Sequence, residues 1–335
     1  MRKLASIQII KDIRPIEGAD NIEVAQVNSW NVVVKKGEYK AGDYCVYCEI
    51  DSFLPIRPEY EFLRKTSYKK MGDQEGFRLK TIKMRNQVSQ GLLLPISVIP
   101  KQEEMYYCDG DDVTDLLGVV KYEPPMPAEL QGVAKGQFPS FLRRTDEERI
   151  QNLSNEYEDM RKERYYVTEK IDGTSGTFYY KDGVFGVCSR NLELVENESN
   201  TYWKIARQYE LQGKMSVLGR NLAIQGEVYG EGIQGNKYKI KGQKLAVFNV
   251  FDIDKQEKMS VYDMTKLCMM FSLTPVPIVD GYYILSPTIE ELLQYAEGKS
   301  KLHPETEREG VVIRSHDCKI SFKAISNKFL LKQKD

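Results

Sequence analysis

A lysine stands where a buried, strand-like stretch of this chain gives way at once to a tight turn. Tyr165, Tyr166 and Val167 open the run Y-Y-V-T-E-K-I-D-G-T-S-G, and this apolar start favours a β-strand. Lys170 closes the stretch, and the D-G pair behind it is typical of a turn. This order holds the lysine at the rim of a pocket. A motif this short also arises by chance, and the plain alternative is an ordinary Asp-Gly turn.

The first part of the chain has the pattern of a small β-barrel, with short strands separated by glycine-containing turns. Strands are expected at residues 22–27, 30–35, 44–50 and 91–94. The stretch from Ile16 to Asp43 looks like the opening of an OB-type domain, an architecture that often binds nucleic-acid ends. We therefore expect an OB-like nucleic-acid-binding domain over residues 1–118. Prolines accumulate after it and deny the backbone its ladder hydrogen bonds, which predicts a linker over residues 119–144.

Residues 145–335 mix strands and helices without strict β-α-β alternation, which predicts an α+β domain with antiparallel sheets and excludes a doubly wound sheet. Strands are expected at residues 177–180, 184–189, 222–229, 245–253, 310–314 and 319–323. Helices are expected at residues 200–211 (closed by Gly213), 260–271 and 289–297 (capped by Thr288 with Glu291). Thr145 and Glu148 fit a capping box, which predicts Arg149 in the first turn of a helix.

Charge and cysteine usage exclude several classes of protein. The net charge of −1 argues against a generally basic nucleic-acid coat protein. No apolar run approaches the roughly 20 residues that span a bilayer, and the N-terminus lacks an apolar signal core, so we expect no membrane contact and a cytoplasmic or nuclear location. Cys45 and Cys48 form a C-x-x-C without a second pair to complete a zinc site, and on a strand they face opposite sides. His303 and His316 lie far from any nucleophile signature, which argues against a Ser/His or Cys/His hydrolase.

Later segments carry charged or aromatic side chains in or beside predicted strands. These side chains are Arg190, Glu227, Phe248, Glu309 and Lys323. Glycines flank Glu227, which suggests a ligand close to the backbone, because glycine weakens a strand; the alternative is a solvent-facing strand residue. Phe248 fits a stacking residue and a core aromatic equally well. Lys319 and Lys328 are weaker cation candidates than Lys323.

These side chains meet the demands of phosphoryl transfer to a lysine. The amine of Lys170 must be uncharged when it attacks, and the triphosphate needs cations. A divalent metal needs oxygen ligands, and Mg²⁺ or Mn²⁺ held through water would suit the carboxylates of Asp172, Glu227 and Glu309. Lys323 is the candidate cation for the α-phosphate.

The order of these elements over about residues 145–330 resembles the covalent nucleotidyltransferases, and K-x-D-G-T-S is similar to the ATP-dependent RNA ligases. Residues 138–152 are similar to the branch in which an OB-like module precedes the catalytic domain. The resemblance implies an ATP-grasp-like ligase fold over residues 145–335 and a covalent bond between Lys170 and AMP. It also implies RNA sealing between a 3′-hydroxyl and a 5′-phosphate, as in a nicked duplex, by a monomer.

The resemblance assigns further residues to the nucleotide. Arg149 would contact the triphosphate with support from Asn152, and Arg190 would contact the ribose or the RNA end. The remaining nucleotide-binding positions are Thr168, Glu169, Ile171 and Gly173. One departure stands out, because ligases usually carry K-x-K in the last element, whereas Ser321 and Ile325 flank Lys323 here.

Other functions stay open at this point. The alternatives are a DNA ligase, a GTP-dependent capping-type nucleotidyltransferase and a non-catalytic RNA-end-binding protein. A kinase-like phosphotransferase ranks last, because G-x-G-x-x-G and an H-R-D-type loop are missing. The N-terminal domain would contact RNA through lysines 65, 69, 70, 80 and 83 with Tyr68 and Phe77 between them, although a solvated charged face explains this pattern equally well.

Overall fold

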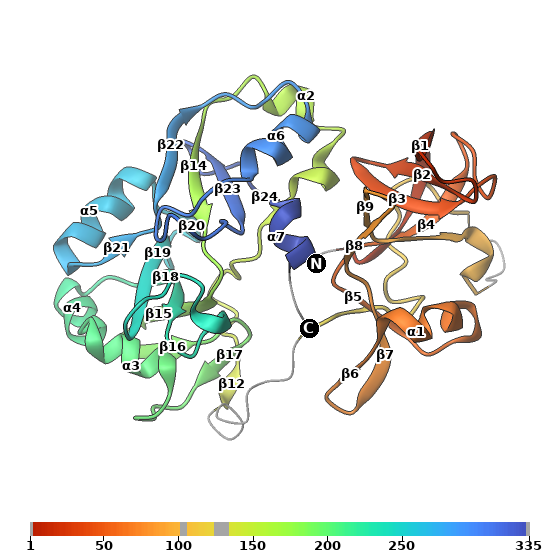
Figure 1. The fold of residues 1–335 in the computed structure, drawn as a ribbon. Helices are drawn as coiled ribbons and strands as arrows, with labels where there is room; N and C mark the ends of the chain where they lie inside the picture. Colours follow the sequence, from red (N-terminus) through yellow and green to blue (C-terminus); the bar gives the residue numbers. More distant parts are fainter. Residues whose placement is uncertain (1–2, 101–105, 124–133, 333–335) are drawn as a thin grey trace. The chain divides into compact units, whose positions relative to one another are not determined.

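The structure is a computed structural model that describes residues 3–100, 106–123 and 134–332. The chain forms two compact units (Figure 1). The N-terminal unit consists of Met1–Pro125, Ile150–Tyr157 and Leu330–Asp335, and the C-terminal unit consists of Met126–Arg149 and Glu158–Phe329. Within the described residues, no helix combines the length and the hydrophobicity needed to span a bilayer.

The N-terminal unit is built from antiparallel sheets that curl into an OB-type barrel. The larger sheet has the order β10 (Leu92–Pro95), β4 (Tyr44–Cys48), β1 (Ala5–Pro15), β2 (Ile22–Val27) and β3 (Trp30–Lys35). The first half of β1 pairs with β4 and the second half pairs with β2, with an irregularity between Ile10 and Asp12. Such a bulge bends a strand and increases its twist, which lets one strand serve both sides of a barrel.

Smaller elements complete this unit. A second sheet has the order β11 (Val120–Lys121), β5 (Ser52–Pro55), β7 (Gln74–Arg78) and β6 (Tyr68–Met71), and β8 (Thr81–Met84) pairs with β9 (Gln87–Gln90). Short helices lie at η1 (Pro58–Leu63), α1 (Arg64–Ser67), η2 (Ile96–Val98) and η4 (Ile150–Leu153).

Strand β4 separates two hydrophobic cores of the N-terminal unit. Cys48 packs on one side with Val46 and Leu54, whereas Cys45 packs on the other side with Trp30 and Tyr47. Burial raises the pKa of both thiols to about 12. The prediction that the C-x-x-C lies in a buried strand, with its cysteines on opposite faces, is therefore confirmed.

The C-terminal unit contains two sheets. The large sheet has the order β12 (Ala134–Gln137), β17 (Leu192–Leu194), β16 (Val184–Cys188), β15 (Thr174–Lys181), β18 (Leu222–Gly230), β19 (Gln243–Asp252) and β20 (Glu257–Lys258), and β21 (Thr274–Pro275) also pairs with β19. The small sheet has the order β13 (Glu148–Arg149), β24 (Ser321–Ile325), β23 (Gly310–Ser315), β14 (Tyr165–Lys170) and β22 (Ile278–Tyr283). Pairing is antiparallel apart from β13 with β24 and β19 with β21, which confirms the predicted α+β class with antiparallel sheets.

Helices cover the large sheet and share its main core. These are α3 (Thr201–Gln208), α4 (Leu211–Leu218) and α5 (Val261–Phe271), and Figure 1 shows them along the strands. The remaining helices are α2 (Tyr157–Met160), η5 (Gln234–Asn236), α6 (Ile289–Ala296) and α7 (Asn327–Lys332). The side chains of Ser260 and Thr288 accept backbone hydrogen bonds at the starts of α5 and α6, as a helix N-cap requires, so both predicted starts are correct.

Two local predictions are wrong. Gly213 does not close a helix, because it lies inside α4, which ends at Gly219 with a left-handed backbone. Thr145 and Glu148 do not form a capping box. Arg149 lies in strand β13, where it pairs with β24, and the hydroxyl of Thr145 contacts that of Ser175 instead. Backbone groups that would have formed hydrogen bonds within a helix thus form them with a strand that is distant in the sequence.

Candidate active site

Lys170 ends strand β14 beside a glutamate from the neighbouring strand. Its Nζ lies 2.8 Å from Oε1 of Glu309, and its side chain keeps 26% of its surface exposed. Lys170 pairs in register with Gly310, the first residue of β23. A Cβ at Gly310 would lie 2.2 Å from the carbonyl oxygen of Ala324, so only glycine permits this close approach of β23 to β24. The fold therefore sets the lysine and the glutamate at one end of the small sheet.

Three carboxylates act electrostatically on the Lys170 ammonium. Burial alone would lower the pKa of Lys170, but Glu309, Glu227 and Asp172 outweigh it and raise that pKa. Burial also raises the pKa of Glu227, to about 8, and that of Glu309, and the negative charge of Asp172 adds to both shifts, against the opposing effect of Lys170. Three carboxylates therefore act on this one ammonium, and their oxygens are the kind of ligand that a divalent cation prefers.

Glu227 lies in β18 of the large sheet, with Gly226 before it in the sequence and Gly173 close to it in space. A Cβ at Gly173 would lie 2.4 Å from the carbonyl oxygen of Val228 and 2.9 Å from Cγ of Glu227. A Cβ at Gly226 would lie 2.6 Å from a side-chain carbon of Leu245. The space beside these glycines is filled by the protein itself, which replaces the interpretation that a ligand approaches the backbone there.

Asp172 has a partner that the sequence did not indicate. Its carboxylate forms an ion pair with Lys237, and its backbone N–H donates to the hydroxyl of Tyr238 at 2.7 Å. The Lys237 ammonium also lies 4.3 Å from the centre of the Phe329 ring. No pattern in the sequence links Lys237 to Asp172, because 65 residues separate them.

The residues flanking Lys170 face different surroundings. The Glu169 carboxylate is buried and accepts hydrogen bonds from Ser300 and from the backbone of Lys301, so its side chain is engaged away from Lys170. The Thr168 hydroxyl donates to the carbonyl of Val312 at 3.3 Å. Ile171 belongs to a small buried cluster. Any contact of Glu169 with a ligand would therefore involve its backbone.

Phe248 is the extra residue of a β-bulge. In the pairing of β18 with β19, Gln225 faces Asn249 and Gly226 faces Val247, which leaves Phe248 without an opposite residue. Phe248 is half-buried and packs against the cluster that contains Ile171. Bulges commonly redirect a side chain beside an active site, and this one gives Phe248 a partly open edge next to the strand end that carries Lys170.

Lys323 lies in β24, between Val312 of β23 and Arg149 of β13. Its positive charge lowers the pKa of Glu309, against the larger effect of burial, which ties it to the carboxylates around Lys170. Of the two residues that flank Lys323 at the K-x-K spacing, Ile325 is buried, and the Ser321 hydroxyl accepts a hydrogen bond from Arg314 at 3.2 Å.

Two predicted nucleotide contacts are engaged elsewhere. Arg190 forms an exposed ion pair with Asp146, with 2.5 Å between nitrogen and oxygen. Asn152 lies in the N-terminal unit, where its amide donates to Glu49 at 2.5 Å and accepts from the Trp30 indole at 2.6 Å.

The lysine-rich face of the N-terminal unit differs from the prediction in one respect. Phe77 is fully buried in a core and is not available for stacking on a base. Tyr68 is half-buried beneath the guanidinium of Arg64, 5.4 Å from its ring centre, and Lys70 pairs with Glu75. This face remains a candidate for RNA contact through its charge.

An ion cluster around the buried Arg314 was not predicted from the sequence. Arg314, Glu147 and Lys258 meet in the C-terminal unit. The sequence carries a signal for it, because Arg314 follows an apolar run within strand β23, and a buried charge requires a partner.

Comparisons with known proteins identify relatives of both parts of the chain. An RNA ligase family model matches residues 163–329, and an OB-fold domain model matches residues 4–96. No curated protein matches. The solved structure of a Naegleria gruberi RNA ligase with PPi is 43% identical, with a TM-score of 0.93 and 99% of each chain covered. A lysine-to-alanine mutant of that ligase with ATP and Mn is 42% identical, with a TM-score of 0.92 and 99% of each chain covered.

Proposed function

This chain belongs to the RNA ligase family, and we propose that it uses ATP to join the 3′-hydroxyl and 5′-phosphate ends of RNA, as at a nick. The observation that carries the proposal is the Lys170 amine, 2.8 Å from Glu309 at the end of β14, with Glu227 and Asp172 also acting on its charge. ATP and Mn in the related structures support the nucleotide and the metal. We expect the protein to act as a monomer in the cytoplasm or nucleus.

In the first step, Lys170, whose side chain is 26% exposed, loses its proton to solvent and Nζ attacks the α-phosphorus of ATP. A nitrogen–phosphorus bond forms, the bond to the β-phosphate oxygen breaks and pyrophosphate leaves. Lys323 offsets charge that develops on the α-phosphate, and Arg149, which pairs with it in register, offsets charge on the departing pyrophosphate. Phe248 stacks on the adenine from its bulge, with Ile171 in the same apolar cluster.

Asp172, Glu227 and Glu309 would hold Mg²⁺ or Mn²⁺. Within the described residues, no three acidic, histidine or cysteine side chains converge as direct ligands, so we infer contacts through water, which Mg²⁺ favours. Such an ion would neutralise the carboxylates that now raise the pKa of Lys170 and would lower the barrier to its deprotonation.

In the next steps AMP passes from Lys170 to the 5′-phosphate of the RNA, and the 3′-hydroxyl then displaces AMP to form the phosphodiester bond. Arg190 is the proposed contact to the ribose or the RNA end, and Asn152 supports the triphosphate. Thr168, Glu169 and Gly173 complete the nucleotide site. The N-terminal unit would bind the RNA flanks through its charged face.

The test is the intact mass of the protein after incubation with ATP and Mn²⁺. We expect a gain of one AMP that pyrophosphate reverses, and Lys170→Ala should abolish it because the acceptor nitrogen is gone. Lys181→Ala is a matched control, because Lys181 lies on β15 with its ammonium on Asp182. Retained labelling in Lys170→Ala would reject this lysine as the acceptor.

Substrate choice separates the remaining alternatives. A capping-type enzyme would form the adduct from GTP, and a DNA ligase would seal nicked DNA in preference to nicked RNA. A non-catalytic RNA-end-binding protein would bind nicked RNA but form no adduct with any nucleotide.

A further inference from the structure

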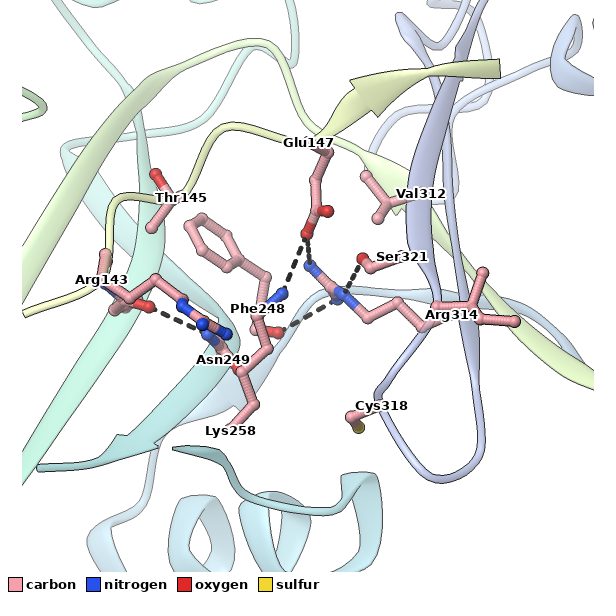
Figure 2. Close-up of polar contacts among 12 residues, drawn as sticks. Arg143, Thr145, Glu147, Phe248, Asn249, Lys258, Val312, Arg314, Cys318 and Ser321 are labelled. Carbon is pink, nitrogen blue, oxygen red and sulfur yellow. Dashed lines mark hydrogen bonds and ion pairs between the residues drawn. The ribbon is translucent and has the colours of Figure 1, made fainter. Parts of the chain in front are cut away.

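The guanidinium of Arg314 donates hydrogen bonds to three different parts of the C-terminal unit. Its Nη2 donates to the carboxylate of Glu147 at 3.0 Å, and its Nη1 donates to the backbone carbonyl of Phe248 at 3.2 Å. Its Nε donates to the hydroxyl of Ser321 at 3.2 Å. Figure 2 shows the guanidinium between these three groups. Only 5% of the side chain is exposed, so solvent cannot replace these hydrogen bonds.

Glu147 extends the cluster to a second strand of the large sheet. Its Oε1 also accepts from Nζ of Lys258 on β20 at 3.4 Å. Burial would raise the pKa of Glu147, but Arg314 and Lys258 overcome this and hold its pKa below the ordinary value. The carboxylate is therefore ionised, and the cluster links the small sheet to β19 and β20 of the large sheet.

Each end of this cluster adjoins a group that the proposed function assigns to ATP. The carbonyl that Arg314 binds belongs to Phe248, the unpaired residue of the bulge. Glu147 lies two residues before Arg149, which pairs in register with Lys323. An adenine contact and a phosphate contact are thus connected through one buried guanidinium.

We propose that Arg314 is a positioning residue for the nucleotide, because it fixes the Phe248 bulge and the Glu147 segment relative to each other. This inference rests on the proposed function, in which Phe248 contacts adenine. Backbone bulges have several accessible geometries, and a hydrogen bond to the bulge carbonyl selects one of them. Without it, ATP would bind to a bulge that must first be ordered, which raises the KM for ATP more than it lowers the rate at saturation.

The informative substitution is Arg314→Lys. A lysine keeps the positive charge for Glu147, but its single ammonium cannot reproduce the forked donors that also reach Phe248 and Ser321. We expect the KM for ATP in lysine–AMP formation to rise about tenfold, with the rate at saturating ATP within about threefold of wild type.

A double-mutant cycle with Phe248→Ala separates positioning from general stability. If Arg314 acts through the Phe248 bulge, Arg314→Lys raises the KM for ATP far less once Phe248 is absent. Arg220→Lys is the control for the arginine-to-lysine change itself, because the exposed Arg220 forms an ion pair with Asp252 at the far end of β19, 2.9 Å apart. This control should leave the KM for ATP unchanged.

An unchanged KM for ATP in Arg314→Lys would overturn the proposal. So would a rise in this KM that is equal in the wild-type and the Phe248→Ala backgrounds. If Arg314→Lys does not fold, the charge-balanced variant Glu147→Gln with Arg314→Gln takes its place, with the same expected rise and the same overturning result. The wild-type adduct is measured first. Its absence would reject the proposed function, whereas an adduct with no effect at Arg314 rejects only the positioning role.

Discussion

Two ion clusters of the C-terminal unit adjoin opposite ends of strand β23 and shift the pKa of their glutamates in opposite directions. Glu309, which precedes β23, shares the Lys170 ammonium with two further carboxylates, Glu227 and Asp172. At the other end, the single carboxylate of Glu147 accepts from two cations, Arg314 and Lys258. Burial raises the pKa of Glu227 to about 8, yet the pKa of the buried Glu147 lies below its ordinary value.

The difference shows that neighbouring charges, and not burial alone, decide what a buried glutamate can do. Around Lys170, Glu227 and Glu309 keep raised pKa values despite the nearby ammonium, and the proposed metal ion would favour their charged forms. The carboxylate of Glu147 is already paired with Arg314 and Lys258 and needs no bound ion. One strand therefore adjoins the proposed reactive end of the unit and a structural end.

The largest effect should follow from a change at the reactive end. Glu309→Gln keeps the shape of the side chain but removes a proposed metal contact and the charge beside Lys170, so lysine–AMP formation should slow by about 10²–10³-fold. Stability to urea should not fall, because the raised pKa of Glu309 means that its charged form is disfavoured in the folded protein. Single-turnover labelling and urea unfolding measure the two quantities.

Glu305→Gln provides the control for this change, because Glu305 pairs with Lys239 on the surface, with 78% of its side chain exposed. Normal labelling in Glu309→Gln, or a loss of stability as large as the one expected at Glu147, would remove the distinction between the two ends.

The second effect concerns the structural end. Glu147→Gln leaves Arg314 and Lys258 buried without their shared anion, and breaking a buried ion pair in this way costs about 3 kcal/mol of unfolding free energy. Labelling at saturating ATP should persist in the folded fraction. The measurement is the urea midpoint with an unchanged slope, and a stability equal to wild type would show that this cluster contributes nothing net.

Local patterns in the sequence predicted much of this fold. The strands 22–27 and 30–35 have the predicted bounds, because alternation and turn residues act within a few positions. The helix starts at Ser260 and Thr288 were predicted for the same reason, since a cap bonds to the backbone three residues on. Lys170 and Glu309, predicted from separate motifs, meet across one pair of strands.

Long-range pairing explains the failures. The capping box at Thr145 was overruled because β13 pairs with β24, more than 170 residues later in the chain. The same holds for the contact of Glu147 with Arg314, 167 residues apart. The bulge at Phe248 depends on the register between two strands, which alternation along one strand cannot reveal.

The smallest effect is a pH dependence confined to the structural end. Because the pKa of Glu147 is lower in the folded protein than its ordinary value of 4.5, the folded state binds this proton less readily than the unfolded state. Its stabilising contribution is therefore fully present above that ordinary value and is lost as pH falls through the lowered value. The difference in unfolding free energy between wild type and Glu147→Gln should stay constant from pH about 7 to about 5 and shrink towards pH about 3. Urea titrations at each pH measure it, and a difference that stays level or grows in acid would mean that the carboxylate charge is not what holds Arg314 and Lys258 together.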